Sequence, residues 1–120
     1  MEMQVTTDQY TAPDLDPPGP SLGDLYVYSG HAVQDGSRVG QGGGTCQVIQ
    51  VEGEQITTQC VLTIELERGS LTAQALWVTG RSPLDMAITG GTGDYREARG
   101  TARFWDIATP QERARFEVVY

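Results

Sequence analysis

Lysine is absent from this chain, and histidine and cysteine are scarce, with one and two copies among 120 residues. The cations are eight arginines against sixteen acidic residues, so the formal net charge is −8. This charge repels phosphate backbones, and nucleic acid is therefore not an expected partner. His31 and the two cysteines, Cys46 and Cys60, have no metal-ligand spacing, so neither a metal nor another cofactor is expected.

Long apolar runs and strong helix formers are also missing. No run approaches the roughly 20 residues that a membrane-spanning helix needs, so no membrane partner is expected. Residues Met1–Gln4 show neither the basic nor the apolar features of a signal peptide. This predicts a cytoplasmic protein, or a secreted one if a signal peptide has been removed. Fifteen glycines favour an all-β chain, and 120 residues fit a single domain spanning 1–120.

Hydrophobicity alternates with a period of two, which is typical of half-buried β-strands. The segment 56–66 shows it best, because Ile56, Cys60 and Ile64 alternate with mostly polar neighbours. Eight short strands with tight turns predict an antiparallel up-and-down β-barrel, with a two-sheet sandwich as the rival. An eight-stranded barrel encloses packed side chains or one small ligand. The predicted strands are 2–11, 24–33, 38–51, 55–67, 70–79, 84–90, 95–107 and 113–120.

Two connections between the strands carry further information. The Pro-rich connection 12–23 is interpreted either as a linker between the first two strands or as a flap across one mouth of the barrel. Arg68-Gly69 is predicted as a two-residue hairpin loop, which would place Cys60 opposite Trp77. The apolar faces of both strands match in that register.

The two cysteines lie symmetrically about a turn at Gly53, so Cys46 should face Cys60 on the neighbouring strand. Cross-strand pairs place their Cβ atoms about 4.5–5.5 Å apart, near the range in which a disulfide closes. We therefore predict a Cys46–Cys60 disulfide in an oxidising compartment, and two small buried thiols in a reducing cytosol.

Ser29 and His31 share one face of a predicted strand. A turn at 34–37 would pair this strand with the next, so that both side chains face the alternate glycines at 40 and 42 and the lumen. A rim position in water is the alternative for His31. Tyrosines nearby add further hydrogen-bond donors. The predicted catalytic residues are Ser29, His31, Tyr28 and Tyr10.

Apolar residues on the inward faces either fill the core or line a pocket for a small molecule. The alternate glycines of 40–44 indicate either strong curvature of the wall or room for a ligand. Trp77 stands beside small alanines, whereas Trp105 alternates with Phe104 and is expected outside. The predicted substrate-binding residues are Leu62, Ala75, Trp77, Met86, Ile88, Phe104 and Phe116.

Three blocks of sequence point to a known family. The most specific is Ala87–Tyr95, which reads AITGGTGDY, and Gly43–Cys46 and Ser21–Leu25 accompany it. These blocks resemble plant allene oxide cyclase and the bacterial proteins of the allene oxide cyclase-like, dirigent-like barrel superfamily. The resemblance covers residues 21–120 and implies an eight-stranded antiparallel barrel with an apolar lumen.

The resemblance to the plant enzyme extends to only part of its site. Cys46 matches the lumen cysteine of the family, but Gly30 stands where the plant enzyme has an asparagine. The first-strand glutamate of the plant enzyme has no counterpart, and Asp8 is the nearest carboxylate. Bacterial relatives of this barrel include cofactor-free cyclases that close rings in polyketide products. The all-arginine cation set is typical of a high-GC bacterial gene.

We therefore predict a cofactor-independent cyclase or isomerase of bacterial natural-product biosynthesis. It would fold an apolar polyene or polyketide-type substrate in the lumen and direct a Diels–Alder-like ring closure by shape. One alternative is a non-catalytic, dirigent-like binding protein for a hydrophobic small molecule. The other is a secreted structural barrel with a filled lumen. The expected partner is a hydrophobic small molecule, and a homodimer is left open.

Overall fold

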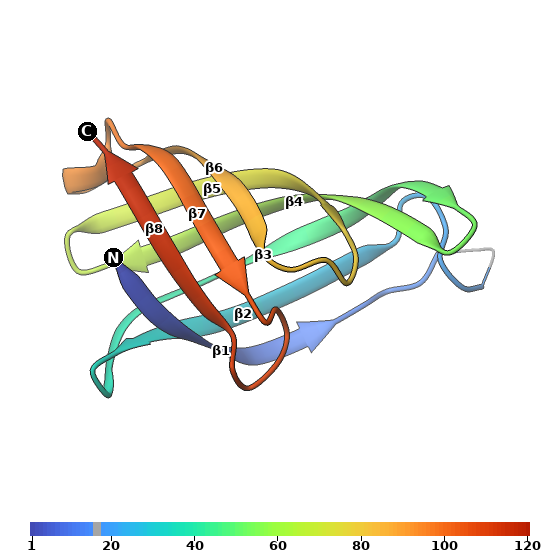
Figure 1. Ribbon diagram of the computed structural model, residues 1–120, viewed down its shortest axis with the longest axis horizontal. Helices are drawn as coiled ribbons and strands as arrows, with labels where there is room; N and C mark the ends of the chain where they lie inside the picture. The colour runs from blue at the N-terminus through green and yellow to red at the C-terminus, as the bar shows by residue number, and fades with distance from the viewer. Residues whose placement is uncertain (16–17) are drawn as a thin grey trace.

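Eight antiparallel strands close into a barrel in the computed structural model, which describes residues 1–15 and 18–120. Each strand pairs with the next along the chain, and the last pairs with the first (Figure 1). This confirms the predicted fold class and excludes the two-sheet sandwich. The elements are β1 (Glu2–Thr11), β2 (Leu25–Gln34), β3 (Ser37–Glu52), β4 (Gln55–Leu66), β5 (Gly69–Val78), β6 (Leu84–Gly91), the short 3₁₀ helix η1 (Gly93–Tyr95), β7 (Arg99–Trp105) and β8 (Arg113–Val119).

The alternation of apolar and polar residues decides which side of each strand faces the barrel interior. On β8, Ala114 and Phe116 are buried, whereas Arg113, Arg115 and Glu117 are exposed. The buried residues of all the strands form a continuous apolar core. None of the helical segments among the described residues is long and apolar enough to cross a lipid bilayer.

The hairpin between β4 and β5 turns one residue earlier than predicted. Its loop is Glu67-Arg68, so Leu66 pairs with Gly69, and Cys60 faces Ala75 rather than Trp77. Gly69 is a strand residue with φ at 147°, where an added Cβ would overlap the main chain of Thr92. The glycine is therefore required for a close approach of backbones rather than for the loop. The register moves by two residues, an even number, so the inward faces remain as predicted.

A bulge between β2 and β3 overturns the predicted orientation of Ser29 and His31. Ala32 pairs with Gly40 but Val33 pairs with Arg38, so β3 carries one extra residue at this point. A shift of one residue exchanges the two faces of a strand. Ala32 therefore faces the core, and His31 and Ser29 alternate with it on the outer face.

The barrel is tightly closed at one end and open at the other. β1 pairs with β8 only over Glu2–Gln4, and β5 pairs with β6 only over Leu71–Gln74. Beyond these short seams, the remaining lengths of β1 and β5 have a neighbour on one side only. β3 and β4, which are longer, extend past the other strands at this end (Figure 1).

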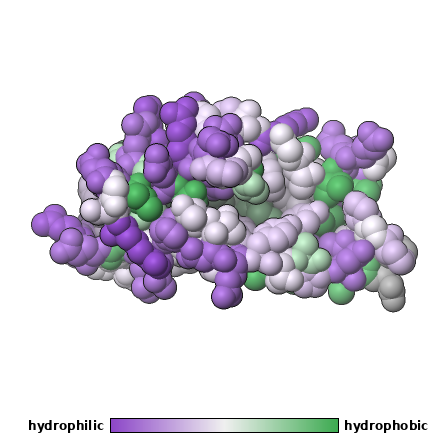
Figure 2. Space-filling model, turned by 90° about the horizontal axis from the view of Figure 1, so that it is seen from below, coloured by the Kyte–Doolittle hydropathy of each residue, from purple (hydrophilic) through white to green (hydrophobic). Residues whose placement is uncertain are grey.

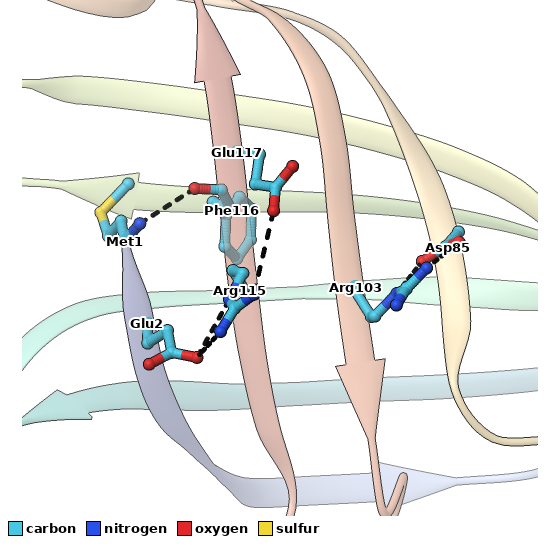
Figure 3. A network of polar contacts seen from close by, with 7 residues as sticks. All are labelled: Met1, Glu2, Asp85, Arg103, Arg115, Phe116 and Glu117. Atoms are coloured by element: carbon cyan, nitrogen blue, oxygen red, sulfur yellow. Dashed lines mark hydrogen bonds and ion pairs between the residues drawn. The ribbon is translucent and has the colours of Figure 1, made fainter.

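Ion pairs cross the outer surface where the barrel closes (Figure 3). Arg103 of β7 and Arg115 of β8 lie directly opposite each other, and each binds its own carboxylate. Asp85 is 2.6 Å from Arg103, and Glu2 is 2.7 Å from Arg115. These guanidinium groups lower the pKa of both carboxyl groups through charged hydrogen bonds. Pairing with carboxylates offsets the repulsion between the two arginines.

Asp24 anchors the connection between β1 and β2. Its carboxylate accepts hydrogen bonds from the main-chain N–H groups of Leu15 and Ser21, at 2.7 and 3.0 Å. These bonds, the first of them above all, lower the pKa of Asp24. Residues 16–17 of the predicted connection 12–23 lie outside the described residues. None of its described residues borders the barrel cavity, so in this part the connection serves as a linker rather than as a flap.

Candidate functional site

A cavity of about 380 Å³ occupies the open half of the barrel. Residues from the open ends of the strands border it, together with the loop 106–112 that joins β7 to β8. Figure 2 shows the molecule from below, with a hollow right of centre that leads between the side chains. The lumen is therefore open to a small molecule rather than filled from end to end.

Apolar side chains from seven strands and one loop form most of the cavity wall. Phe104 and Phe116 meet edge to face, with ring centroids 6.0 Å apart. Ala75 and Ile88, predicted as substrate-binding, do not border the cavity; Ile88 is 5% exposed and packs in the core. The apolar residues that border the cavity are Met3, Val5, Ala32, Leu62, Ile64, Trp77, Leu84, Met86, Phe104, Ile107, Ala108 and Phe116.

Four large aromatic side chains surround the open part of the cavity: Tyr10, Tyr26, Tyr28 and Trp77. Tyr28 and Tyr10, predicted as catalytic, pair across β1 and β2, and Tyr10 is 60% exposed at the rim. Burial raises the pKa of Tyr28 to about 12, and the negative charge of Glu112 adds to the effect. Tyr28 therefore remains a hydrogen-bond donor at neutral pH. Tyr26 is a cavity residue that the sequence prediction missed, although it alternates with Tyr28.

Glu112 is a further cavity residue that the sequence prediction missed. Its side chain borders the cavity, and its Oε1 accepts a hydrogen bond from the main-chain N–H of Ala108 at 2.7 Å. Burial raises the pKa of Glu112, and the bond from Ala108 acts in the opposite direction. The signal was present in the sequence, since 112 continues the inward alternation of Ala114 and Phe116 beyond the start of β8.

The charge of the cavity wall is negative. Among the described residues that border it, Glu112 is the one carboxylic acid, and none is an arginine. A carboxyl group in an apolar, partly closed space has a perturbed proton affinity, and such groups are typical of functional sites. Among residues 1–15 and 18–120, no three His, Cys, Asp or Glu side chains lie close enough together to hold a metal ion.

Ser29 and His31 border the cavity, although the register of β2 places both on the outer face of this strand. The bulge in β3 directs both to the outer face of β2, and Ser29 is exposed. A second bulge, in β1 between Thr7 and Gln9, lets Asp8 reach His31 on that face. The His31 Nδ1 and Asp8 Oδ1 atoms are 2.8 Å apart. Both predicted residues border the cavity near Gly30, where the wall has no side chain of its own.

The Cys46–Cys60 disulfide forms part of the cavity wall. The two residues pair directly across β3 and β4, with their Cα atoms 4.0 Å apart. Thr58 lies fully buried beside them, and its hydroxyl donates a hydrogen bond to the Trp77 carbonyl at 2.9 Å. The disulfide therefore joins β3 to β4, the strand that carries Thr58 opposite Trp77.

The glycines of β3 allow the cavity wall to bend. A Cβ at Gly42 or Gly44 would overlap a main-chain carbonyl of β4, and one at Gly43 would overlap the carbonyl of Tyr28 on β2. Neighbouring backbones therefore approach more closely than any side chain would permit. This supports the interpretation of these glycines as sites of curvature, and Gly42 and Gly43 also border the cavity.

The family is identified by a match that extends over the whole chain. The family model described as allene oxide cyclase barrel like domain matches residues 1–120. The chain belongs to this family. The match confirms the resemblance carried by the AITGGTGDY block and its companions, and it agrees with the closed eight-stranded barrel.

Solved structures of similar proteins include both near and distant barrels of this kind. One named pyocyanin demethylase is 35% identical, with a TM-score of 0.94, and the match covers 99% of this chain and 98% of that one. The Diels-Alderase AbmU from Streptomyces koyangensis is 18% identical, with a TM-score of 0.73, over 98% of this chain and 58% of that one. The exo-specific intermolecular Diels-Alderase AbnU is 16% identical, with a TM-score of 0.79, over 98% and 96%. The last two are alike in fold alone. No curated protein matches the chain.

Proposed function

We propose that this barrel is an enzyme that binds a compact, flat, apolar molecule in its open half, and that Glu112 moves a proton on that molecule. The observation that carries the proposal is one carboxyl group inside an otherwise apolar cavity. Burial raises its pKa toward neutrality, where a group gives and takes protons efficiently. Tyr28 supplies a hydrogen-bond donor in the same space.

The dimensions and lining of the cavity favour an aromatic substrate. A volume of about 380 Å³ lies near the lower end of the range of about 300–1,000 Å³ that small-molecule sites occupy. This favours a compact ring system over a long polyene. Tyr26, Tyr28 and Trp77 offer ring faces for stacking, and the carboxylate of Glu112 favours a substrate with a positive or partly positive ring.

The relative at 35% identity supports a substrate of the same kind. Its name describes the removal of a methyl group from pyocyanin. We infer that the present chain acts on a flat molecule similar to pyocyanin, and that Glu112 accepts a proton from that molecule or returns one to it. The loop 106–112 and Tyr10 then frame the entrance through which the substrate passes.

Ring closure of a small apolar polyene is the second candidate function. Its supporting observation is the apolar share of the cavity wall, to which Leu62, Ile64 and Met86 contribute. A pericyclic closure needs a folded near-attack conformer in a dry space rather than a proton transfer. This candidate therefore predicts a reaction that depends on the shape of the cavity and is insensitive to the charge of Glu112.

One experiment separates the candidates. Purified protein is incubated with pyocyanin or with a short linear polyene, turnover is followed by mass spectrometry, and binding is followed by tryptophan fluorescence. Glu112→Gln is expected to bind pyocyanin but to lose about 100- to 10,000-fold in turnover, the usual contribution of one general acid or base. Glu117→Gln is the matched control, because Glu117 lies on the outer face of β8, the strand that Glu112 directly precedes.

The outcomes are distinct. Pyocyanin turnover that survives in Glu112→Gln would contradict the proton-transfer role. Turnover of the polyene alone, equal in both variants, would favour ring closure by shape. Binding of either molecule without turnover by the unaltered protein would indicate a dirigent-like carrier instead of an enzyme.

A further inference from the structure

We propose that the main-chain N–H of Ala108 is the positioning group of this site: it holds Oε1 of Glu112 and so presents the other carboxyl oxygen to the bound molecule. This inference rests on the proposed function, in which Glu112 is the proton-transfer group. The hydrogen bond from Ala108 to Oε1 measures 2.7 Å, and both residues border the cavity. No buried side-chain oxygen or nitrogen among the described residues lacks a partner, so Oε2, for which no hydrogen bond is seen, is accessible rather than fully buried.

The backbone around Ala108 adopts a left-handed conformation that is unusual for residues other than glycine. Ala108 has φ at 64° and Asp106 has φ at 53°, in the left-handed region that residues other than glycine rarely adopt. Such conformations persist only where the surrounding structure imposes them, and they cluster at functional sites. Here the left-handed turn at Ala108 directs its N–H at the carboxyl group of Glu112.

Hydrogen bonds within the loop hold this conformation in place. The hydroxyl of Thr109 donates to the Asp106 carbonyl at 2.6 Å and accepts the N–H of Gln111 at 3.2 Å. The N–H of Asp106 donates to Ser82 Oγ at 3.2 Å, which ties the loop to the neighbouring connection. At the other end, the Glu112 carbonyl accepts the N–H of Val5 on β1 at 2.9 Å. Both ends of the loop are thus fixed to other elements.

The two influences on Glu112 act in opposite directions. Burial favours the protonated carboxyl group, whereas a hydrogen bond from a main-chain N–H favours the ionised one. Ala108 therefore limits the effect of burial and keeps Glu112 able to accept a proton. The ionisable side chain that faces Glu112 from β2 is Tyr28, whose pKa of about 12 keeps it protonated throughout the titration of Glu112.

The test is a titration of Glu112 without any substrate. The carboxyl carbon of Glu112 is followed by NMR in protein labelled with ¹³C-glutamate, and the signal is assigned by its loss in Glu112→Gln. Ala108→Val is expected to move the N–H away, because a β-branched residue tolerates φ near 64° poorly. The proton affinity of Glu112 should then rise about tenfold, which is about the worth of one hydrogen bond to a charged group.

Two further variants show whether the effect is specific. Ala108→Gly keeps the N–H and suits a positive φ, so its titration should match that of the unaltered protein. Gln111→Ala shortens an exposed side chain of the same loop and keeps both the N–H of Ala108 and the hydroxyl of Thr109, so it controls for a general loosening of the loop. A titration that is unchanged in Ala108→Val, or shifted equally in Gln111→Ala, would overturn the inference.

The kinetic consequence follows the titration. If pyocyanin is turned over, the limb of its pH–rate profile that reports Glu112 should move to higher pH in Ala108→Val and return in Ala108→Gly. If the titration shifts as expected but no variant turns over pyocyanin, the positioning role stands and the proposed function fails. If turnover depends on Glu112 but the titration of Glu112 is the same in Ala108→Val as in the unaltered protein, the proposed function stands and the positioning role fails.

Discussion

The disulfide in the cavity wall allows a quantitative prediction. Replacing Cys46 and Cys60 together by alanine removes a covalent link between β3 and β4 that closes a loop with a sequence separation of 14. In the chain-entropy model a loop of this length contributes about 3 kcal/mol to the free energy of unfolding. The two sulfur atoms are also buried, at 5% and 1% residue exposure, so their removal leaves space that the wall must close.

This free energy converts into a shift of the thermal midpoint. The entropy of unfolding is about 2.1 cal/mol/K per residue, which gives about 0.25 kcal/mol/K for 120 residues. A loss of about 3 kcal/mol therefore lowers Tm by about 12 °C. Tm should fall whenever the disulfide is lost. The size of the fall depends on how much conformational freedom the unfolded chain gains without the disulfide.

Differential scanning calorimetry of the oxidised protein, the reduced protein and the double variant provides the assay. A reductant should lower the Tm of the unaltered protein nearly to that of Cys46→Ala/Cys60→Ala, and it should leave the variant unchanged. Mass spectrometry after alkylation of the denatured protein counts free thiols in each sample. Midpoints that agree within about 2 °C with and without the bond would refute the reasoning, since loop closure alone predicts several times that difference.

Three further predictions follow from the cavity and its wall. Glu112→Gln should raise the free energy of unfolding at pH 8, because the folded protein raises the pKa of this carboxyl group and its ionisation therefore opposes folding; the gain should vanish below the unfolded pKa, as thermal melts at pH 8 and pH 4 would show. Gly44→Ala should cost about 1–3 kcal/mol in urea unfolding, because its Cβ would overlap the carbonyl of Val61. A ligand that enters the lumen should change the fluorescence of Trp77, which borders the cavity, and a signal that survives in Trp77→Phe but not in Trp105→Phe would contradict this assignment.

The two ends of the barrel divide stability from function. At the closed end, β1 pairs with β8, and the ion pair between Glu2 and Arg115 lies on the outer surface of this seam. The open end leaves the later residues of β1 and β5 without a second neighbour, and the cavity lies between them. Because the strands run through both ends, the closed half holds the walls of the open half at fixed spacing. The loop 106–112 then completes the site with the groups that no strand supplies.

The amino-acid sequence determined the architecture, because the alternation of apolar and polar residues in each strand shows which of its side chains are buried. A period of two over eight segments predicts the barrel, and the symmetric placement of Cys46 and Cys60 about Gly53 predicts their pairing across β3 and β4. The inward faces of β4 and β5 survive an error of two residues in their register, since an even shift preserves the alternation. Trp77 and Phe104 could therefore be placed inside from local pattern alone.

Tertiary structure decided the chemistry of the site. One extra residue in β3 reverses the faces of Ser29 and His31, and a single inserted residue leaves no periodic signal in the sequence. Glu112 lies in a segment that the sequence predicts as a polar turn. It continues the inward alternation of β8, but only the tertiary structure shows that Val5 and Ala108 bind its main chain and its carboxyl group. Burial of a charge depends on contacts between segments that are distant in the chain, and local patterns do not encode those contacts. The sequence thus specified which strands form the cavity wall, and the tertiary packing of these strands specified which polar group faces the cavity.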